Sequence, residues 1–162
     1  MTGAGDARRV ELRAASFPAE RDAVAALMHE YVRSVSVSLE FQSPQAEFAA
    51  LPGQYAPPAG CLLVAVVDGA LAGCGALRRI DADTCEMKRL YVRPDARGLG
   101  LGGRLVQGLL DEARAIGYQR ICLDVLPEFA AAQKIYDAFG FQDCEPVSFN
   151  PVPGARFLGR DL

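Results

Sequence analysis

Gly98-Leu99-Gly100-Leu101-Gly102-Gly103 is the stretch that decides the fold of this chain, because a strand pattern precedes it and a helix pattern follows it. The preceding residues 86–92 read Glu-Met-Lys-Arg-Leu-Tyr-Val, and after the glycines apolar residues recur at helical spacing from Leu105 to Ile116. A glycine turn that opens a helix leaves backbone N–H groups unpaired where the helix dipole favours negative charge. No Asp or Glu lies in the first helical turn, and Arg97 and Arg104 flank it. The stretch therefore predicts a phosphate-binding site rather than a plain turn.

Two phosphate motifs fit these letters. Gly98, Gly100 and Gly103 satisfy the dinucleotide pattern G-x-G-x-x-G, with Asp124 about 20 residues further on as a ribose-binding acid. Residues 97–102 also satisfy R-x-x-G-x-G. The strand before the loop is polar, whereas the fingerprint strand of a dinucleotide fold is a buried apolar one. A chain of 162 residues also leaves little room for a dinucleotide domain together with a substrate domain. The second motif is favoured.

Composition excludes several classes of protein. The chain has 162 residues, 51% of them hydrophobic, and a formal net charge of −3, so we expect one globular domain, residues 1–162, without affinity for nucleic acid or an anionic membrane. The N-terminus lacks the apolar core of a signal peptide, and no apolar run is long enough to span a bilayer. The five cysteines form no C-x-x-C pair, and there is a single histidine, so no disulfide framework and no metal site is expected. A cytoplasmic location follows as an expectation.

Periodicity predicts a single mixed α/β sheet. A two-residue hairpin signal, Asp68-Gly69, joins two apolar strands, and the helix after the glycine loop makes the strands on either side of it parallel. Residues 34–39 are ambiguous between a helix end and an extended piece. The remaining elements are expected as follows: strands at 8–14, 61–67, 70–80, 85–92, 120–125, 141–149 and 156–162, and helices at 18–33, 44–51, 102–116 and 128–139. Antiparallel strands thus precede a parallel β-α-β centre, and a C-terminal hairpin closes the sheet.

This order, together with four local matches, resembles the GNAT superfamily of N-acetyltransferases, small bacterial single-domain type, over nearly the whole chain. The matches are the central strand 86–92, the loop 97–102 as a coenzyme A pyrophosphate loop, Ile135-Tyr136 on the next helix, and Gly140-Phe141 at its end. The resemblance implies acetyl-CoA as co-substrate, no metal, and a possible homodimer. It implies that acetyl-CoA is bound by main-chain groups of the central strand and by the loop: Leu90, Tyr91, Val92, Arg97, Gly98, Gly100, Leu101, Gly102 and Gly103.

Two side chains carry the chemistry that the resemblance implies. Glu86 is the candidate general base, because an acceptor amine must lose a proton before it attacks; the alternative is an ion pair with Lys88, Arg78 or Arg79. Tyr136 is the candidate general acid for the departing thiolate, and the alternative is an ordinary packed tyrosine. No cysteine has a neighbouring histidine to activate it, so we expect direct transfer in a ternary complex.

The acceptor is expected to be a small molecule with a primary amine. Its pocket is assigned to the first helix, the loop that follows it and the last strands, at Tyr31, Phe41, Gln42, Tyr55 and Asn150. Many family members carry an asparagine that contacts the cofactor where this chain has Phe129. Three alternatives stay open: a non-catalytic acyl-CoA-binding homologue, a protein or peptide N-acetyltransferase, and the dinucleotide-binding oxidoreductase.

Overall fold

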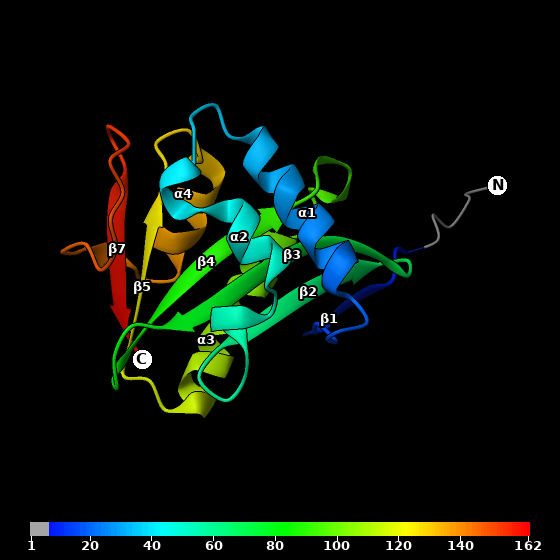
Figure 1. The fold of residues 1–162 in the computed structure, drawn as a ribbon, viewed down its shortest axis with the longest axis horizontal. Helices are drawn as coiled ribbons and strands as arrows, with labels where there is room; N and C mark the ends of the chain where they lie inside the picture. Colours follow the sequence, from blue (N-terminus) through cyan, green and yellow to red (C-terminus); the bar gives the residue numbers. More distant parts are fainter. Residues whose placement is uncertain (1–6) are drawn as a thin grey trace.

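The computed structural model describes residues 7–162 as a seven-stranded sheet with helices on both faces (Figure 1). The strand order across the sheet is β1-β2-β3-β4-β5-β7-β6. The strands are β1 (Val10–Ala14), β2 (Cys61–Val67), β3 (Ala70–Arg79), β4 (Thr84–Val92), β5 (Arg120–Val125), β6 (Gln142–Asp143) and β7 (Arg156–Asp161). The mixed sheet expected from the sequence is confirmed.

Four α-helices and three short 3-10 turns connect the strands of residues 7–162. The helices are α1 (Arg21–Ser34), α2 (Pro44–Ala49), α3 (Leu101–Ile116) and α4 (Ala130–Ala138), and the 3-10 turns are η1 (Glu40–Gln42), η2 (Gly53–Tyr55) and η3 (Pro94–Ala96). None of the helices in this part of the chain is long and apolar enough to cross a membrane. The ambiguous segment 34–39 forms neither a helix nor a strand after Ser34.

Two hydrophobic cores hold the helices against the sheet. α1 and α2 cover one face through a cluster that includes Leu27, Phe48 and Tyr91, whereas α3 covers the other face through Leu105 and Leu109. The sheet is built for close approach on the α3 side, because a Cβ on Gly75 of β3 would lie 2.8 Å from Leu109 Cδ1. These cores fix the position of β4, which contributes side chains to both faces.

The hairpin between β2 and β3 follows the expected turn. Asp68 and Gly69 both have positive φ, of 50° and 84°, as a type I′ turn requires at its two central residues. The strands pair directly from the turn, Val67 with Ala70 and Val66 with Leu71, and the register then shifts by one residue, so that Ala65 pairs with Gly73. The two-residue hairpin turn predicted from Asp68-Gly69 is therefore confirmed, because local backbone preference sets this turn.

β4 and β5 separate after a short parallel contact. Their pairing covers only three positions and ends at Glu86 and Cys122, after which β5 pairs with β7 alone. β4 also carries a bulge, because Tyr91 and Lys88 pair with Cys74 and Ala76 of β3, which places an extra residue on β4. The residue at the bulge, Arg89, has a φ of 61°. A gap therefore opens between two strands at the centre of the sheet.

The C-terminal hairpin is shorter than the sequence predicted. The strand expected at 141–149 pairs with β7 only at Gln142 and Asp143. The next residues leave the sheet because Pro146 has no N–H for a ladder and because two side chains turn inward: Ser148 Oγ donates to Glu86, and Asn150 Nδ2 donates to Asp124. The prediction of a long strand here is wrong, since these long-range polar contacts outweigh the local apolar pattern.

Candidate active site

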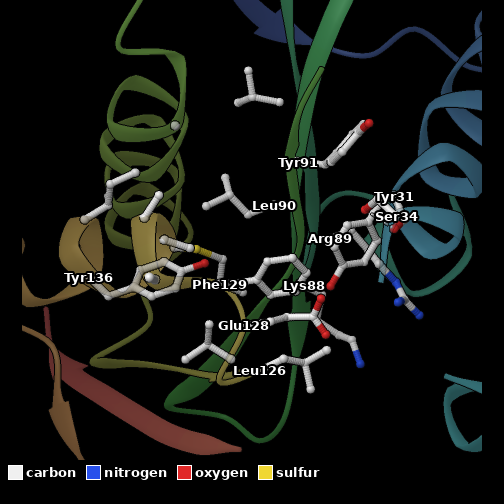
Figure 2. Close-up of a pocket in the computed structure, with 18 of the residues that line it drawn as sticks. Tyr31, Ser34, Lys88, Arg89, Leu90, Tyr91, Leu126, Glu128, Phe129 and Tyr136 are labelled. Atoms are coloured by element: carbon white, nitrogen blue, oxygen red, sulfur yellow. Dashed lines mark hydrogen bonds between the residues drawn. The ribbon is translucent and has the colours of Figure 1, made fainter. Parts of the chain in front are cut away.

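A cavity of about 710 Å³ lies where β4 and β5 part (Figure 2). One end is lined by the glycine loop, the start of α3 and small or apolar residues of α4, such as Ala131 and Ile135. The other end is lined by polar side chains from α1, β4, β5 and the segment before β7. The cavity is thus one continuous space, with the glycine loop at one end and polar side chains at the other.

The glycine loop leaves an open surface at the first end. Gly98 and Gly100 have φ of 88° and 69°, and a Cβ on either would meet no atom within 4 Å. The first α-helical bond of α3 runs from Arg104 N to Gly100 O, so the N–H groups of residues 101–103 have no partner within the helix. Arg97 lines the same end and makes no ion pair within residues 7–162. Unpaired N–H groups, helix dipole and a cation suit the phosphates of a nucleotide cofactor.

The edge of β4 forms one wall of the middle of the cavity. Leu90, Tyr91 and Val92, the main-chain partners expected for the cofactor, all line it. Beyond Glu86 these residues have no β5 partner, so the side of β4 that faces β5 carries no ladder. The residues expected to bind the cofactor, in the strand and in the loop, are all brought to this one cavity.

Arg89 holds the bulge of β4 against the helical layer that carries α2. Its side chain is only 2% exposed, and its Nε and Nη2 donate to the two carboxylate oxygens of Glu47 at 2.8 and 3.2 Å. Nη1 donates to Gln42 Oε1 at 2.6 Å, and the guanidinium lies 5.2 Å from the centre of the Phe48 ring. A positive φ is costly for a residue with a Cβ, and these contacts stabilise it.

Tyr136 lies on α4 with its ring buried at the inner wall of the cavity (Figure 2). Its ring packs against Phe141 at 5.6 Å between centroids. Burial raises the pKa of its phenol well above the usual value, and the charges of Tyr31 and Asp124 act in the same direction. The hydroxyl therefore keeps its proton throughout the neutral range, which is the state that a proton donor needs.

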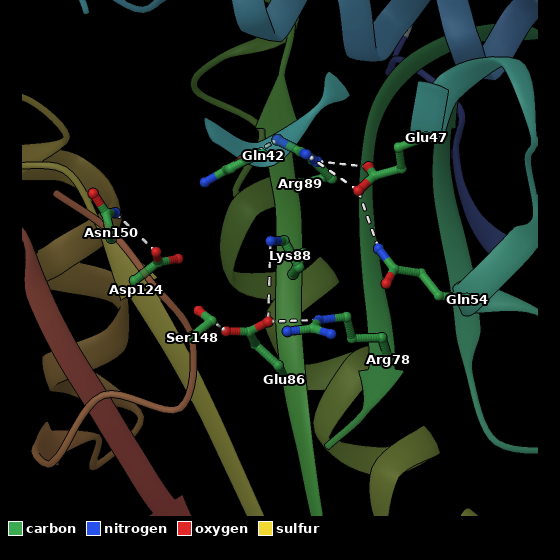
Figure 3. A network of polar contacts seen from close by, with 10 residues as sticks. All are labelled: Gln42, Glu47, Gln54, Arg78, Glu86, Lys88, Arg89, Asp124, Ser148 and Asn150. Carbon is green, nitrogen blue, oxygen red and sulfur yellow. Dashed lines mark hydrogen bonds and ion pairs between the residues drawn. The ribbon is translucent and has the colours of Figure 1, made fainter. Parts of the chain in front are cut away.

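Glu86 is fully buried and held by two hydrogen bonds (Figure 3). Its Oε1 accepts from Arg78 Nε at 2.7 Å, and its Oε2 accepts from Ser148 Oγ at 2.7 Å. Lys88 Nζ lies at 4.0 Å from Oε1. Glu86 does not line the cavity, and the pocket-lining group nearest to it by these contacts is Lys88. Glu86 therefore forms the ion pair with Arg78 that the sequence offered as the alternative to a role as base.

The residues assigned to the acceptor from sequence fall into two groups. Tyr31, Gln42 and Asn150 line the polar end of the cavity, whereas Phe41 and Tyr55 do not. Phe41 packs edge-on against the exposed ring of Phe149, at 6.1 Å between centroids. Tyr55 is fully buried in the core under α1 and α2. An aromatic residue in a loop gives no sign in sequence of whether it faces a core or a cavity.

Phe129, which replaces the asparagine common in the resembled family, precedes α4 and lines the cavity. Its ring stacks on Tyr31 of α1 with centroids 6.0 Å apart and planes 28° from parallel. Tyr31 is partly buried, and desolvation raises its pKa to about 12. The pair connects the two walls of the cavity by apolar contact where an asparagine would offer an amide.

Three charged residues that line the cavity were not proposed as site residues from sequence. They are Lys88 and Arg89 on β4 and Glu128 before α4. Asp124 on β5 also lines the cavity, and the sequence marked it only as the ribose-binding acid of the dinucleotide alternative. The consecutive charges of Lys88 and Arg89 break the alternation expected of a strand, and this break is the local sign of the bulge that could have marked them. Asp124 carries no such sign, because an acidic residue in a short strand is equally compatible with a solvated face.

The buried thiols of the sheet are unreactive. Burial raises the pKa of Cys61, Cys74 and Cys85 to about 12, so they stay protonated near neutral pH. Across the described part of the chain, no group of three or more His, Cys, Asp or Glu side chains is arranged to hold a metal ion.

Comparisons with known proteins agree with this geometry. The model of the acetyltransferase (GNAT) family matches residues 24–141. An uncharacterised N-acetyltransferase of Schizosaccharomyces pombe is 36% identical over 155 residues, which cover 94% of this chain and 95% of that protein. The N-acetylaspartate synthetase of Rattus norvegicus is 30% identical over 131 residues, covering 80% of this chain and 44% of that protein. A structure of an acetyltransferase from Salmonella typhimurium with acetyl-CoA has a TM-score of 0.72, 20% identity, and coverage of 94% of each chain.

Proposed function

The chain belongs to the acetyltransferase (GNAT) family and is an acetyl-CoA-dependent N-acetyltransferase, and we propose that its acceptor is the primary amine of a small molecule. The observation that carries the proposal is the continuous cavity between β4 and β5, which joins a glycine loop suited to phosphates to a polar end. Acetyl-CoA spans a pyrophosphate, an extended arm and a thioester, and these three parts require such a continuous space.

The proposed transfer proceeds by direct attack. The acceptor ammonium loses one proton, which is necessary because only about one amine in a thousand is free at neutral pH. Its nitrogen then attacks the thioester carbonyl carbon, so that a C–N bond forms and the C–S bond breaks. Tyr136 gives its proton to the leaving thiolate, and its phenolate takes the second proton from the acceptor nitrogen. The products are the acetamide, coenzyme A and one released proton.

Backbone donors of β4 support the charge that develops on the carbonyl oxygen. An N–H group among residues 90–92, fixed before the reaction, would donate to that oxygen as in an oxyanion hole. The neighbouring bulge is held by Arg89 and Glu47, and this anchoring keeps the donors in place. Such preorganised donors contribute about 3–4 kcal/mol each in comparable sites.

Two carboxylates are candidates for the first proton transfer. Glu86, the candidate from the sequence, has both oxygens engaged by Arg78 and Ser148, so a proton would reach it only through Lys88 or a water molecule. Asp124 lines the cavity directly. We keep Glu86 as the proposed base to be tested, with Asp124 as its competitor.

A small acceptor is favoured by the way the polar end is covered. The segment after α1 reaches the turn before α4, where Ser36 donates from its Oγ to Glu128 Oε1 at 2.7 Å and from its N–H to the same carboxylate. Phe41 and Phe149 meet beside it. These contacts bridge the space that a peptide would need. A relative named N-acetylaspartate synthetase supports the same class of acceptor.

The test is a calorimetric titration with acetyl-CoA, with NADH as the control ligand, followed by thiol release with a panel of small amines. Micromolar binding of acetyl-CoA and release of thiol that depends on the amine would support the proposal. Binding without turnover of any amine would favour a non-catalytic acyl-CoA-binding homologue. Turnover of peptide N-termini or lysines alone would move the acceptor to proteins.

Three further proposals concern the chain as a whole. We propose that residues 1–162 act as one domain, that the chain forms a homodimer, and that it works in the cytoplasm. Light scattering on the purified protein would measure the mass of the assembly, and a mass near the 17.3 kDa of one chain would exclude the dimer.

A further inference from the structure

Lys88 and Asp124 face each other across the gap between β4 and β5. The last parallel pair of these strands is Glu86 with Cys122, and each of the two residues lies two positions beyond it. Side chains two positions apart point to the same face of a strand, so Lys88 and Asp124 share one face of the sheet on opposite sides of the opening. Both line the cavity, and Figure 3 shows their side chains on the two separate strands.

The ammonium of Lys88 is buried without a close partner. Its side chain is 11% exposed, and within residues 7–162 its Nζ makes no hydrogen bond; the nearest carboxylate oxygen, Glu86 Oε1, is 4.0 Å away. That oxygen already accepts from Arg78 at 2.7 Å. Burial lowers the pKa of Lys88, as expected for a cation whose charge is only partly compensated. The donors of Lys88 are therefore available to an anion in the cavity.

The carboxylate of Asp124 is held in place through one of its two oxygens. Asn150 Nδ2 donates to Asp124 Oδ2 at 2.8 Å, and Asn150 Oδ1 accepts from Val152 N–H at 3.0 Å, which fixes the direction of the amide. Among the described residues, Asp124 Oδ1 accepts no hydrogen bond. One carboxylate oxygen is thus held by the protein, and the other is left for a cation in the cavity.

The other charged residues that line the cavity are committed elsewhere. Arg89 is bound to Glu47 and Gln42, and Glu128 accepts from Ser36. Arg97 lies at the glycine loop, at the opposite end of the cavity. Lys88 and Asp124 are therefore the pair of opposite charges that the polar end offers to a substrate, and they do not lie within 4.0 Å of each other.

We propose that the acceptor is an amino acid, with its carboxylate bound by Lys88 Nζ and its ammonium bound by Asp124 Oδ1. A zwitterion satisfies both groups at once, whereas a plain amine would leave the Lys88 cation with only the distant Glu86 carboxylate, at 4.0 Å, in a desolvated site. This inference rests on the proposed N-acetyltransferase function and specifies its substrate class.

The test compares the twenty common L-amino acids with their carboxamides, which lack the anionic carboxylate, as acceptors in the thiol-release assay. For the wild-type enzyme we expect kcat/KM for the best amino acid to exceed that of its carboxamide by at least about tenfold. This factor corresponds to the loss of one close charge-assisted interaction. In Lys88→Met, which keeps the length but not the charge, this ratio should fall toward one. Lys88→Arg should restore part of it.

Acetyl-CoA affinity serves as the control for folding, because Lys88 lies at the opposite end of the cavity from the glycine loop. An acid-to-amide ratio near one in wild type, or an unchanged ratio in Lys88→Met with normal acetyl-CoA binding, would overturn the inference. Turnover of amines without a carboxylate, such as diamines or arylamines, but of no amino acid would overturn it and leave the acetyltransferase function standing. Absence of acetyl-CoA binding would overturn both.

Discussion

Replacing Glu47 by alanine tests the anchoring of the β4 bulge. Glu47 on α2 accepts two hydrogen bonds from Arg89, and the two side chains are 12% and 2% exposed. The variant leaves Arg89 with the Gln42 amide and the face of the Phe48 ring. A buried guanidinium thereby loses its only close carboxylate within the described residues, and it cannot discharge by losing a proton.

The expected loss of stability is large. Breaking a buried ion pair by removing one partner costs about 3–5 kcal/mol, because the remaining charge is uncompensated. Since Gln42 and Phe48 still contact the guanidinium, we expect the lower end, about 3 kcal/mol. With a urea slope of about 2 kcal/mol/M, this corresponds to a midpoint about 1.5 M lower.

The assay is urea unfolding followed by circular dichroism, with Asp161→Ala as the matched control. Asp161 also pairs with an arginine, Arg120, at 2.9 Å, but it is 89% exposed, so its loss should cost about 0–1 kcal/mol. If Glu47→Ala lowered the midpoint no more than Asp161→Ala does, burial would not amplify this ion pair, and the account of Arg89 as the anchor of the bulge would be wrong.

Three further substitutions probe the site. Gly100→Asp should weaken acetyl-CoA binding, measured by calorimetry, at least about tenfold more than Gly100→Asn. The two introduced side chains differ in charge but not in size or in tolerance of positive φ. Equal affinities of the two variants would place the phosphate site elsewhere. Tyr136→Phe should lower kcat about 10²-fold or more with little change in KM for acetyl-CoA. Tyr118→Phe, which removes a phenol that donates to Ala59 O outside the cavity, should leave kcat intact. An unchanged kcat in Tyr136→Phe would contradict the role of Tyr136 as general acid. Glu86→Gln should depress the rate most at low pH, where few acceptor amines are free, and a pH profile parallel to that of wild type would point to another base.

Local sequence determined much of the fold and the cofactor end of the site. The glycine loop, the turn at Asp68-Gly69 and the limits of β2 and β5 follow from backbone preference and side-chain periodicity, which act between near neighbours. For the same reason, the glycine loop proposed to bind the cofactor could be placed at the start of α3. These features depend on a few consecutive residues, so no knowledge of packing is needed to read them.

The polar end of the cavity was decided by tertiary structure. Lys88 and Asp124 face each other only because the pairing of β4 with β5 stops at Glu86, and no short stretch of sequence encodes where two distant strands part. Sequence proposed Glu86 as the general base and Tyr55 as an acceptor-pocket residue, and packing places the first in a buried ion pair and the second in the core. The type of a residue sets the chemistry that its side chain can perform. Long-range strand register and burial determine which other residues it contacts.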